Sequence, residues 1–233
     1  MKGRGMMALA AAALLPLAAA CAPGMTSGGL SGTGRADVAA HAFVSAVDAG
    51  EIQQGQLAQQ RAQNQAVRAY GQRMVADHSN ALALREQRMG GMGLSLRAGT
   101  SMMAGSEGMS AGANVSAGSG SGGGGGGNGM FSSAMVLSPG GMADLNAVLM
   151  ANPNSRPVAE TAMRDLQMLQ QLNGAAFDRA YITRQAEMHQ YTLENMDRLL
   201  AQPISGDLRT LLTTQRAAVA MHLQMAQQLR GQL

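Results

Sequence analysis

The apolar residues of this chain recur every three or four positions, which is the spacing of one face of an α-helix. The pattern predicts six helices, four of them long, over residues 36–61, 65–89, 142–150, 158–172, 175–200 and 206–229. No segment shows a convincing alternation of apolar and polar residues, the pattern typical of a strand. The sequence therefore predicts an all-α protein.

The four long helices favour a bundle. Only Gln63 and Asn64 separate the first two, and so short a junction makes them antiparallel neighbours. Asn64 and Ser205 are expected to cap the helices that follow them, and Asp37 to cap the first long helix. We expect an up-and-down four-helix bundle.

The composition changes abruptly between the second and third long helices. Residues 90–141 are dominated by glycine, serine, alanine and methionine, and include the run SGSGGGGGGNGM. Glycine loses more entropy on ordering than any other residue, so we expect a long disordered insert here. Its irregularly spaced methionines are candidate soft ligands for copper, but a solvated linker is the simpler interpretation. The insert separates a first helical hairpin, residues 36–89, from the second half of the bundle, residues 142–233.

The beginning of the chain is typical of an export signal. Residues 1–21 combine Lys2 and Arg4 with an apolar run and with small residues before Cys21. The run is short for a membrane span. Its ending, LAAAC, resembles a bacterial lipobox, although the leucine stands one position early. We expect a lipid anchor on Cys21, followed by a flexible tether over residues 22–35; ordinary secretion and an uncleaved anchor are the alternatives.

These features predict a lipoprotein of the cell envelope, exported to the periplasm and anchored to the outer membrane through Cys21. An envelope protein is a second candidate partner. Without Lys2 and Arg4 the chain has 15 basic and 14 acidic residues, and no run of five like charges, so we expect no nucleic-acid partner. The single cysteine excludes an intrachain disulfide and a thiolate metal cage. The chain has no G-x-S-x-G motif and no phosphate-binding glycine loop, which disfavours a nucleophilic enzyme.

Each long helix places one metal-competent side chain on its apolar face. These side chains are Glu51, His78, His189 and His222. All four lie near the midpoints of their helices, so they can share one or two adjacent layers of a bundle. Buried polar groups without partners are costly, and two arrangements avoid that cost. Either the imidazoles hydrogen-bond to Glu51, to Tyr70 or Tyr181 or to water, or they bind a divalent metal such as zinc or iron.

Three carboxylates and one further histidine are also relevant to this candidate site. Asp77, Asp178 and Glu187 are candidate hydrogen-bond partners that would orient metal-bound rings. The fourth histidine of the chain, His41, lies on no clear apolar stripe and is expected to be solvated.

Three segments of the chain resemble the bacterial domain of unknown function 4142 family: residues 43–79, residues 172–190, and VAMHLQMAQQL around His222. The order and spacing of the matching residues are kept, namely Phe43, Glu51, the run from Met74 to His78, Phe177, Asp178, Tyr181 and His189. The resemblance implies an exported, ferritin-like four-helix bundle but no particular activity. Met188 stands where the family tends to have an acidic residue, so no role that needs that carboxylate is expected.

We therefore expect a lipid-anchored bundle of the cell envelope with a binding, structural or stress-related role rather than an enzymatic one. The alternative is a metal-binding or redox bundle that uses Glu51, His78, His189 and His222. Ferritin-like di-iron enzymes need Glu-x-x-His pairs on two helices, and this chain lacks them. Ferritin-type oxidase activity is therefore not expected.

Overall fold

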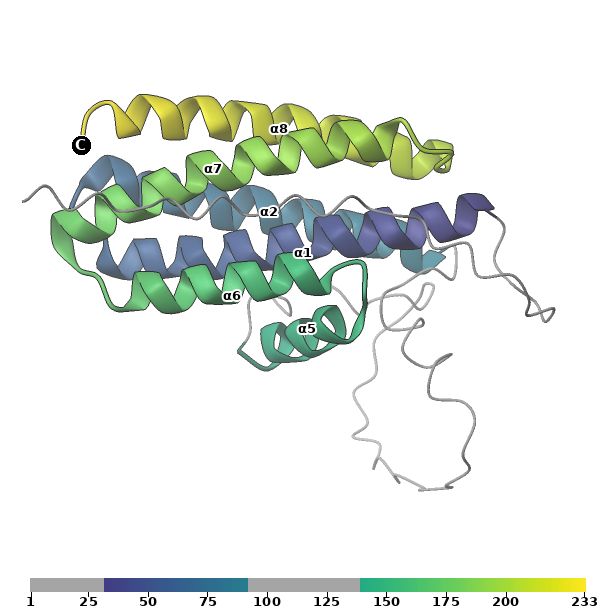
Figure 1. Ribbon diagram of the computed structural model, residues 1–233, viewed down its shortest axis with the longest axis horizontal. Coiled ribbons are helices and arrows are strands. Elements are labelled where there is room, and N and C mark those ends of the chain that lie inside the picture. The colour runs from purple at the N-terminus through teal and green to yellow at the C-terminus, as the bar shows by residue number, and fades with distance from the viewer. Residues whose placement is uncertain (1–31, 92–138) are drawn as a thin grey trace, which may run out of the picture.

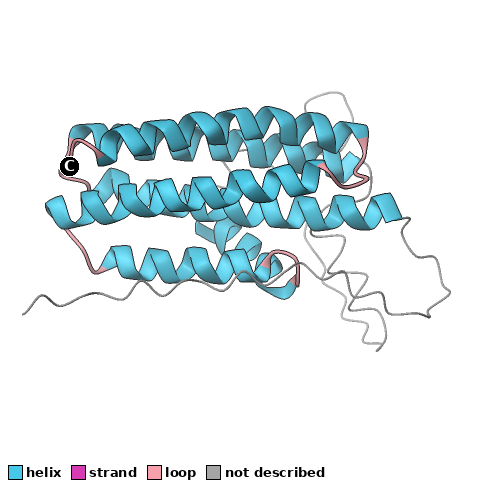
Figure 2. Ribbon diagram, turned by 45° about the horizontal axis from the view of Figure 1, so that its top comes forward, coloured by secondary structure: helices cyan, strands magenta, loops and turns pink. Residues whose placement is uncertain are grey.

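A computed structural model describes residues 32–91 and 139–233 of the chain (Figure 1). These residues form α-helices and no strand: α1 (Gly32–Arg61), α2 (Gln65–Gly91), α5 (Pro139–Ala151), α6 (Arg156–Gln170), α7 (Gly174–Leu200) and α8 (Gly206–Arg230). The predicted all-α class is confirmed (Figure 2). The signal segment with Cys21, and all of the predicted insert except its first two and last three residues, lie outside the described residues.

The four long helices form a four-helix bundle, but not in a simple up-and-down order, because α2 and α7 run in the same direction and α6 runs back between them (Figure 1). Helix α1 packs against α2 and α7, and α8 packs against the same two helices, so the four close into a square. Neighbouring helices in this square run in opposite directions (Figures 1 and 2). The shorter helix α6 packs against α1 and α7, and α5 packs against α1 and α6. None of the described helices combines the length and apolarity that crossing a membrane requires.

The helix ends show which of the predicted caps form. Asn64 Oδ1 accepts a hydrogen bond from the Ala66 N–H at 2.8 Å, and Ser205 Oγ accepts one from the Leu208 N–H at 3.4 Å. The prediction for Asp37 is wrong, because α1 begins at Gly32 and extends through the end of the expected tether. Asp37 Oδ1 instead accepts the N–H of Ser205 at 2.8 Å. This bond ties the turn between α7 and α8 to α1.

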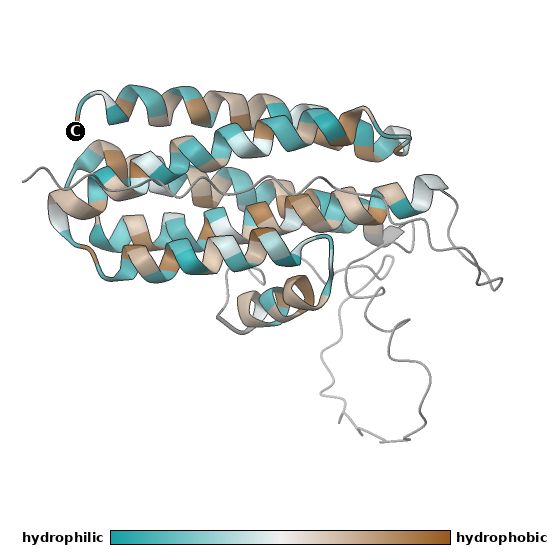
Figure 3. Ribbon diagram, in the orientation of Figure 1, coloured by the Kyte–Doolittle hydropathy of each residue, from teal (hydrophilic) through white to brown (hydrophobic). Residues whose placement is uncertain are grey.

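Two apolar clusters fill the interior, and a polar layer lies between them. On α2 the clusters end at Met74 and Leu82, on either side of His78. The same division falls at His189 on α7 and at His222 on α8, between the following flanking pairs: Ala186 and Met196, and Val219 and Leu223. Polar and apolar residues intersperse along every helix in Figure 3, as expected when one face is buried. The bundle core is thus interrupted by polar side chains near its middle.

Helices α1 and α2 approach closely where two glycines meet. A Cβ atom at Gly71 would lie 2.8 Å from the Cβ of Ala58 and 2.9 Å from the carbonyl oxygen of Gly55. A Cβ atom at Gly55 would lie 2.7 Å from the carbonyl oxygen of Gly71. Distances this short leave no room for a methyl group. The two glycines therefore set the separation of the first hairpin's helices.

We expect Gly71→Ala to lower the free energy of unfolding by about 1–3 kcal/mol, because the added methyl group overpacks the helix contact. Alanine has the higher helix propensity, so an open site would respond in the opposite direction. Gly206→Ala is the matched control, since a Cβ there meets nothing within 4 Å. Urea denaturation of both variants measures the difference. Equal stability of the two variants would contradict the close contact.

Candidate metal centre

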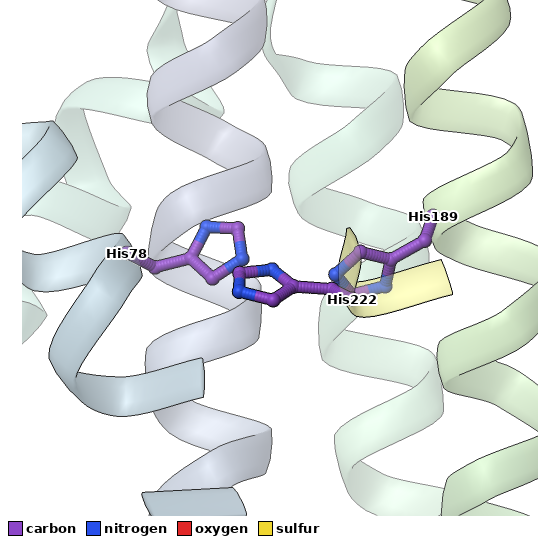
Figure 4. Close-up of side chains that lie close together, drawn as sticks. All are labelled: His78, His189 and His222. Atoms are coloured by element: carbon purple, nitrogen blue, oxygen red, sulfur yellow. The ribbon is translucent and has the colours of Figure 1, made fainter. Parts of the chain in front are cut away.

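Three histidines from three helices meet in the polar layer of the bundle. His78 lies on α2, His189 on α7 and His222 on α8, and their rings point toward one another (Figure 4). One nitrogen of each ring lies within 4.8 Å of the corresponding nitrogens of the other two. The ring centroids are 5.4 to 5.9 Å apart. We call these residues the histidine triad.

One nitrogen of each ring is held by an oxygen that can only accept a hydrogen bond. The three contacts are His78 Nδ1 to Asp48 Oδ1 at 2.7 Å, His222 Nε2 to Asp77 Oδ2 at 2.8 Å, and His189 Nδ1 to the carbonyl oxygen of Gln185 at 2.8 Å. Carboxylate and carbonyl oxygens are acceptors, so each of these nitrogens carries a proton. The acceptors thereby fix both the orientation and the tautomer of a neutral ring.

The opposite nitrogens of the triad have no hydrogen-bond partner among the described residues. They are His78 Nε2, His189 Nε2 and His222 Nδ1. In a neutral ring whose other nitrogen is protonated, such an atom presents a lone pair. The side chains are at most 2% exposed, so bulk water does not satisfy these atoms. The triad therefore gathers three unused lone pairs in a buried space, which is the donor set of a histidine metal site.

The pKa values of the three rings differ. Burial, together with the neighbouring His78, lowers the pKa of His189 to about 3 and that of His222 to about 4. Burial also acts to lower the pKa of His78, but the hydrogen bond and charge of Asp48 outweigh it and raise that pKa. His189 and His222 are therefore neutral at neutral pH, and His78 is the ring that takes up a proton first.

Glu51, the fourth side chain predicted for this site, borders the triad. It is 3% exposed, and its Oε1 lies 3.8 Å from His189 Nδ1. Its Oε2 has no hydrogen-bond partner within the described part of the chain. Burial raises the pKa of Glu51. The group of ligand atoms within 4.8 Å of one another contains the three histidines and leaves Glu51 outside. The structure thus brings three of the four predicted residues together and places the fourth at their edge.

A network around a buried arginine adjoins the triad. Its members are His41, Ser45, Asp48, Arg85 and Gln215, and we call it the Arg85 network. Asp48 links the Arg85 network to the triad, because its carboxylate contacts Arg85 as well as His78. Burial acts to raise the pKa of Asp48, but Arg85 and the hydrogen bond from His78 outweigh it and lower that pKa. Asp48 is therefore a carboxylate held between a guanidinium and an imidazole.

The profile of the family described as "Domain of unknown function (DUF4142)" matches residues 22–104 and 142–229 of the chain. This chain belongs to the DUF4142 family. The family resemblance predicted from the sequence is thereby confirmed. No match was found among curated proteins or among solved structures. The family has no assigned function, so a role for this DUF4142 protein has to be argued from its buried site.

The prediction that His41 is solvated is wrong for this DUF4142 protein. His41 is fully buried on α1, where its Nδ1 accepts a hydrogen bond from Arg85 Nε at 3.2 Å. Its Nε2 lies 2.9 Å from Glu86 Oε1, in a contact that lacks hydrogen-bond geometry. Helix α1 packs against α2, α5, α6 and α7, so almost its whole circumference is covered over this stretch. The apolar stripe read from the sequence therefore underestimates how many side chains of α1 are buried.

Only one of the three proposed orienting carboxylates contacts the triad. Asp77 does so, through His222. Asp178 accepts the backbone N–H groups of Gln63 and Asn64 at 3.1 and 2.8 Å, which satisfies the start of α2. Glu187 pairs with Arg184 on the same helix. Neither of these two carboxylates has a contact with the triad among the described bonds.

Asp48 and Arg85 are site residues that were not predicted from the sequence. A signal for each was present: Asp48 lies one helical turn before Glu51, and Arg85 lies two turns after His78, so both share a face with a predicted site residue.

The two tyrosines also differ from expectation. The Tyr70 hydroxyl donates to the backbone oxygen of His222 at 3.3 Å rather than to a ring, and the Tyr181 hydroxyl has no partner among the described residues.

Proposed function

We propose that this DUF4142 protein binds a divalent transition-metal ion through His78, His189 and His222, with zinc as the first candidate and iron as the second. One observation carries the proposal: three imidazole nitrogens without partners lie together in the core, while the other nitrogen of each ring is bonded to an oxygen. Histidine ligands of metals usually donate their second N–H to a carboxylate or carbonyl in this way.

A hydrogen-bonded layer without metal is the competing interpretation. It would pair the free ring nitrogens with Glu51 or with the hydroxyls of Tyr70 and Tyr181. The contacts found do not do this, because Tyr70 donates to a backbone oxygen and Glu51 faces the ring nitrogen of His189 that Gln185 already holds. Three unpaired nitrogens would be a large cost in so small a volume. A bound cation removes that cost.

Three imidazoles leave a fourth position in a tetrahedral site. Glu51 is the nearest buried carboxylate, and its Oε2 is unpaired within the described residues. It would complete the coordination directly or hold a water molecule there. Protein-supplied imidazole and carboxylate suit zinc and iron, whereas the soft thiolates that select copper(I) are missing from this part of the chain.

The buried charges near the triad also fit a divalent ion. The side chains of Asp48, Glu51 and Glu86 are buried carboxylates, and Arg85 is the buried guanidinium among them. Burial raises the pKa of Glu51, which favours its protonated form in the absence of a cation. A divalent cation beside it would favour the carboxylate, and that carboxylate would in turn stabilise the bound ion.

Metal analysis of protein purified without a histidine tag tests the proposal. We expect about one metal ion per chain, in line with the four-coordinate sites that three histidines form. Dialysis against a chelator should remove the ion, and added zinc should restore it. The absence of stoichiometric metal both before and after incubation with zinc or iron(II) would rule the proposal out.

We also propose that the protein acts in the cell envelope, exported to the periplasm and held at the outer membrane by a lipid on Cys21. The support comes from residues 1–21, whose basic start, apolar run and LAAAC ending resemble a lipoprotein signal. Cys21→Ser should shift the protein from the membrane fraction to the soluble fraction of cells. Ser27→Ala, in the expected tether that follows, should leave it in the membrane. If Cys21→Ser remains in the membrane fraction, the anchor is not this cysteine.

A further inference from the structure

Arg85 is a fully buried arginine on α2, two helical turns beyond His78. Its guanidinium reaches three other members of the Arg85 network on α1 and one on α8. The bonds are Nε to His41 Nδ1 at 3.2 Å, Nη1 to Gln215 Oε1 at 2.8 Å, Nη2 to Ser45 Oγ at 3.1 Å and Nη2 to Asp48 Oδ2 at 2.5 Å. Because a buried charge is costly to desolvate, such a pair is weak evidence for stability alone. Its position next to the triad suggests a different role.

Both oxygens of Asp48 are fixed by this arrangement. Oδ2 accepts from Arg85, and Oδ1 accepts from Gln215 Nε2 at 2.6 Å and from His78 Nδ1 at 2.7 Å. Gln215 is itself held by Arg85. Arg85 thus acts on Asp48 twice, directly through Oδ2 and indirectly through the amide that occupies Oδ1. The carboxylate plane is fixed, and so is the direction from which it meets His78.

We propose that Arg85 is a positioning residue for the metal centre, which acts through Asp48 to hold the His78 ring with its Nε2 toward His189 and His222. The inference rests on the proposed metal binding. It is specific to one ring of the triad. His189 is held by a backbone carbonyl and His222 by Asp77, which is more than a third exposed, so only His78 depends on a buried charged network.

The shape of the guanidinium matters as well as its charge. Three of its nitrogens donate in different directions, to α1 and to α8, and a lysine ammonium cannot reproduce that fork. Arg85→Lys keeps the charge beside Asp48 but loses the bonds to its other partners. Arg85→Met removes both. The two variants therefore separate charge compensation from geometric positioning.

Cobalt(II) is a suitable probe, because its visible spectrum reports the coordination geometry. We expect Arg85→Met to lower the cobalt affinity of the folded protein by about 10- to 100-fold and to alter the spectrum, as changes behind a metal-bound histidine do. Arg85→Lys should recover part of the affinity. Arg184→Met is the matched control, since Arg184 pairs with Asp165 and Glu187 outside the Arg85 network. A purely structural role would lower the thermal stability of Arg85→Met but leave affinity and spectrum unchanged, and would overturn the inference.

A second measurement needs no metal. The His78 Nδ1–H proton should exchange slowly in the metal-free protein and in Arg184→Met, and should exchange faster in Arg85→Met; unchanged exchange overturns the inference. If the unaltered protein binds no cobalt, the proposed function fails, and this NMR signal still decides whether Arg85 positions His78.

A second variant covers the case in which Arg85→Met does not fold. Gln215→Met removes the Gln215 hydrogen bond to Asp48 but leaves that of Arg85, so no buried charge loses its partner. It should then produce a smaller change in the same direction, and no change in affinity or exchange counts against the inference.

Discussion

Replacing His189 with alanine is expected to abolish stoichiometric metal binding. The ring supplies one of three nitrogens that lie within 4.8 Å of one another, and two remaining imidazoles cannot hold the ion in a closed site. Loss of a group behind a metal ligand already costs about 10- to 100-fold in affinity, so loss of the ligand itself should cost at least about 100-fold. Competition against a chromophoric chelator, with zinc as the titrant, measures this change.

Thr192→Val is the control for a change in the buried part of α7. Thr192 is as deeply buried as His189 but belongs neither to the triad nor to the Arg85 network. This variant should still bind one ion per chain. Circular dichroism would show that both variants are folded. Retention of tight, stoichiometric zinc by His189→Ala would contradict a site built on the triad.

Asp48→Ala is expected to lower the free energy of unfolding of the metal-free protein by about 3–5 kcal/mol, because it leaves the Arg85 guanidinium buried without its carboxylate. The same change removes the partner of His78 Nδ1 and of Gln215 Nε2. In a protein of this size the melting temperature should fall by about 6–20 °C. Thermal and urea unfolding, both followed by circular dichroism, measure the effect.

Asp77→Ala provides the comparison, since Asp77 also contacts a ring of the triad but is more than a third exposed. Water can replace its carboxylate, and the expected loss is only about 0–1 kcal/mol. The double variant Asp48→Leu/Arg85→Met should recover much of the loss caused by Asp48→Ala, because it removes the unpaired charge. A double variant less stable than Asp48→Ala would show that the cost does not come from the isolated guanidinium.

The helices could be predicted from sequence because each long one repeats its apolar positions over several turns. That pattern located α1, α2, α7 and α8 to within a few residues, and Asn64 and Ser205 signalled where two of them begin. The start of α1 was harder. Gly32 and Gly34 are poor helix formers, so the predicted helix began at residue 36. The hydrogen bond that the Ser205 N–H donates to Asp37 is a tertiary contact, which no local pattern reveals.

Only part of the site could be predicted from sequence, because the rest depends on tertiary contacts. Helical spacing assigns His78, His189 and His222 to inward faces, and their mid-helix positions bring them to one layer, so the triad follows from single-helix patterns. The partners of these rings depend on how each helix is rotated against its neighbours. Asp48 lies opposite His78 only because α1 and α2 pack in one register, and periodicity within α1 does not encode that. His41 was misjudged for the same reason, since its burial comes from four surrounding helices.

The depth of the triad has a consequence for how fast a bound metal ion could exchange with the solvent. Its three rings are at most 2% exposed and come from α2, α7 and α8, so an ion seated among them has no direct route to the solvent. It would depart only when these helices separate transiently. Its residence time would then be set by the rate of this local opening of the protein rather than by the strength of the coordinate bonds. A metal ion bound there would be retained for long periods, which suits a structural or catalytic metal better than one that the protein transfers to a partner.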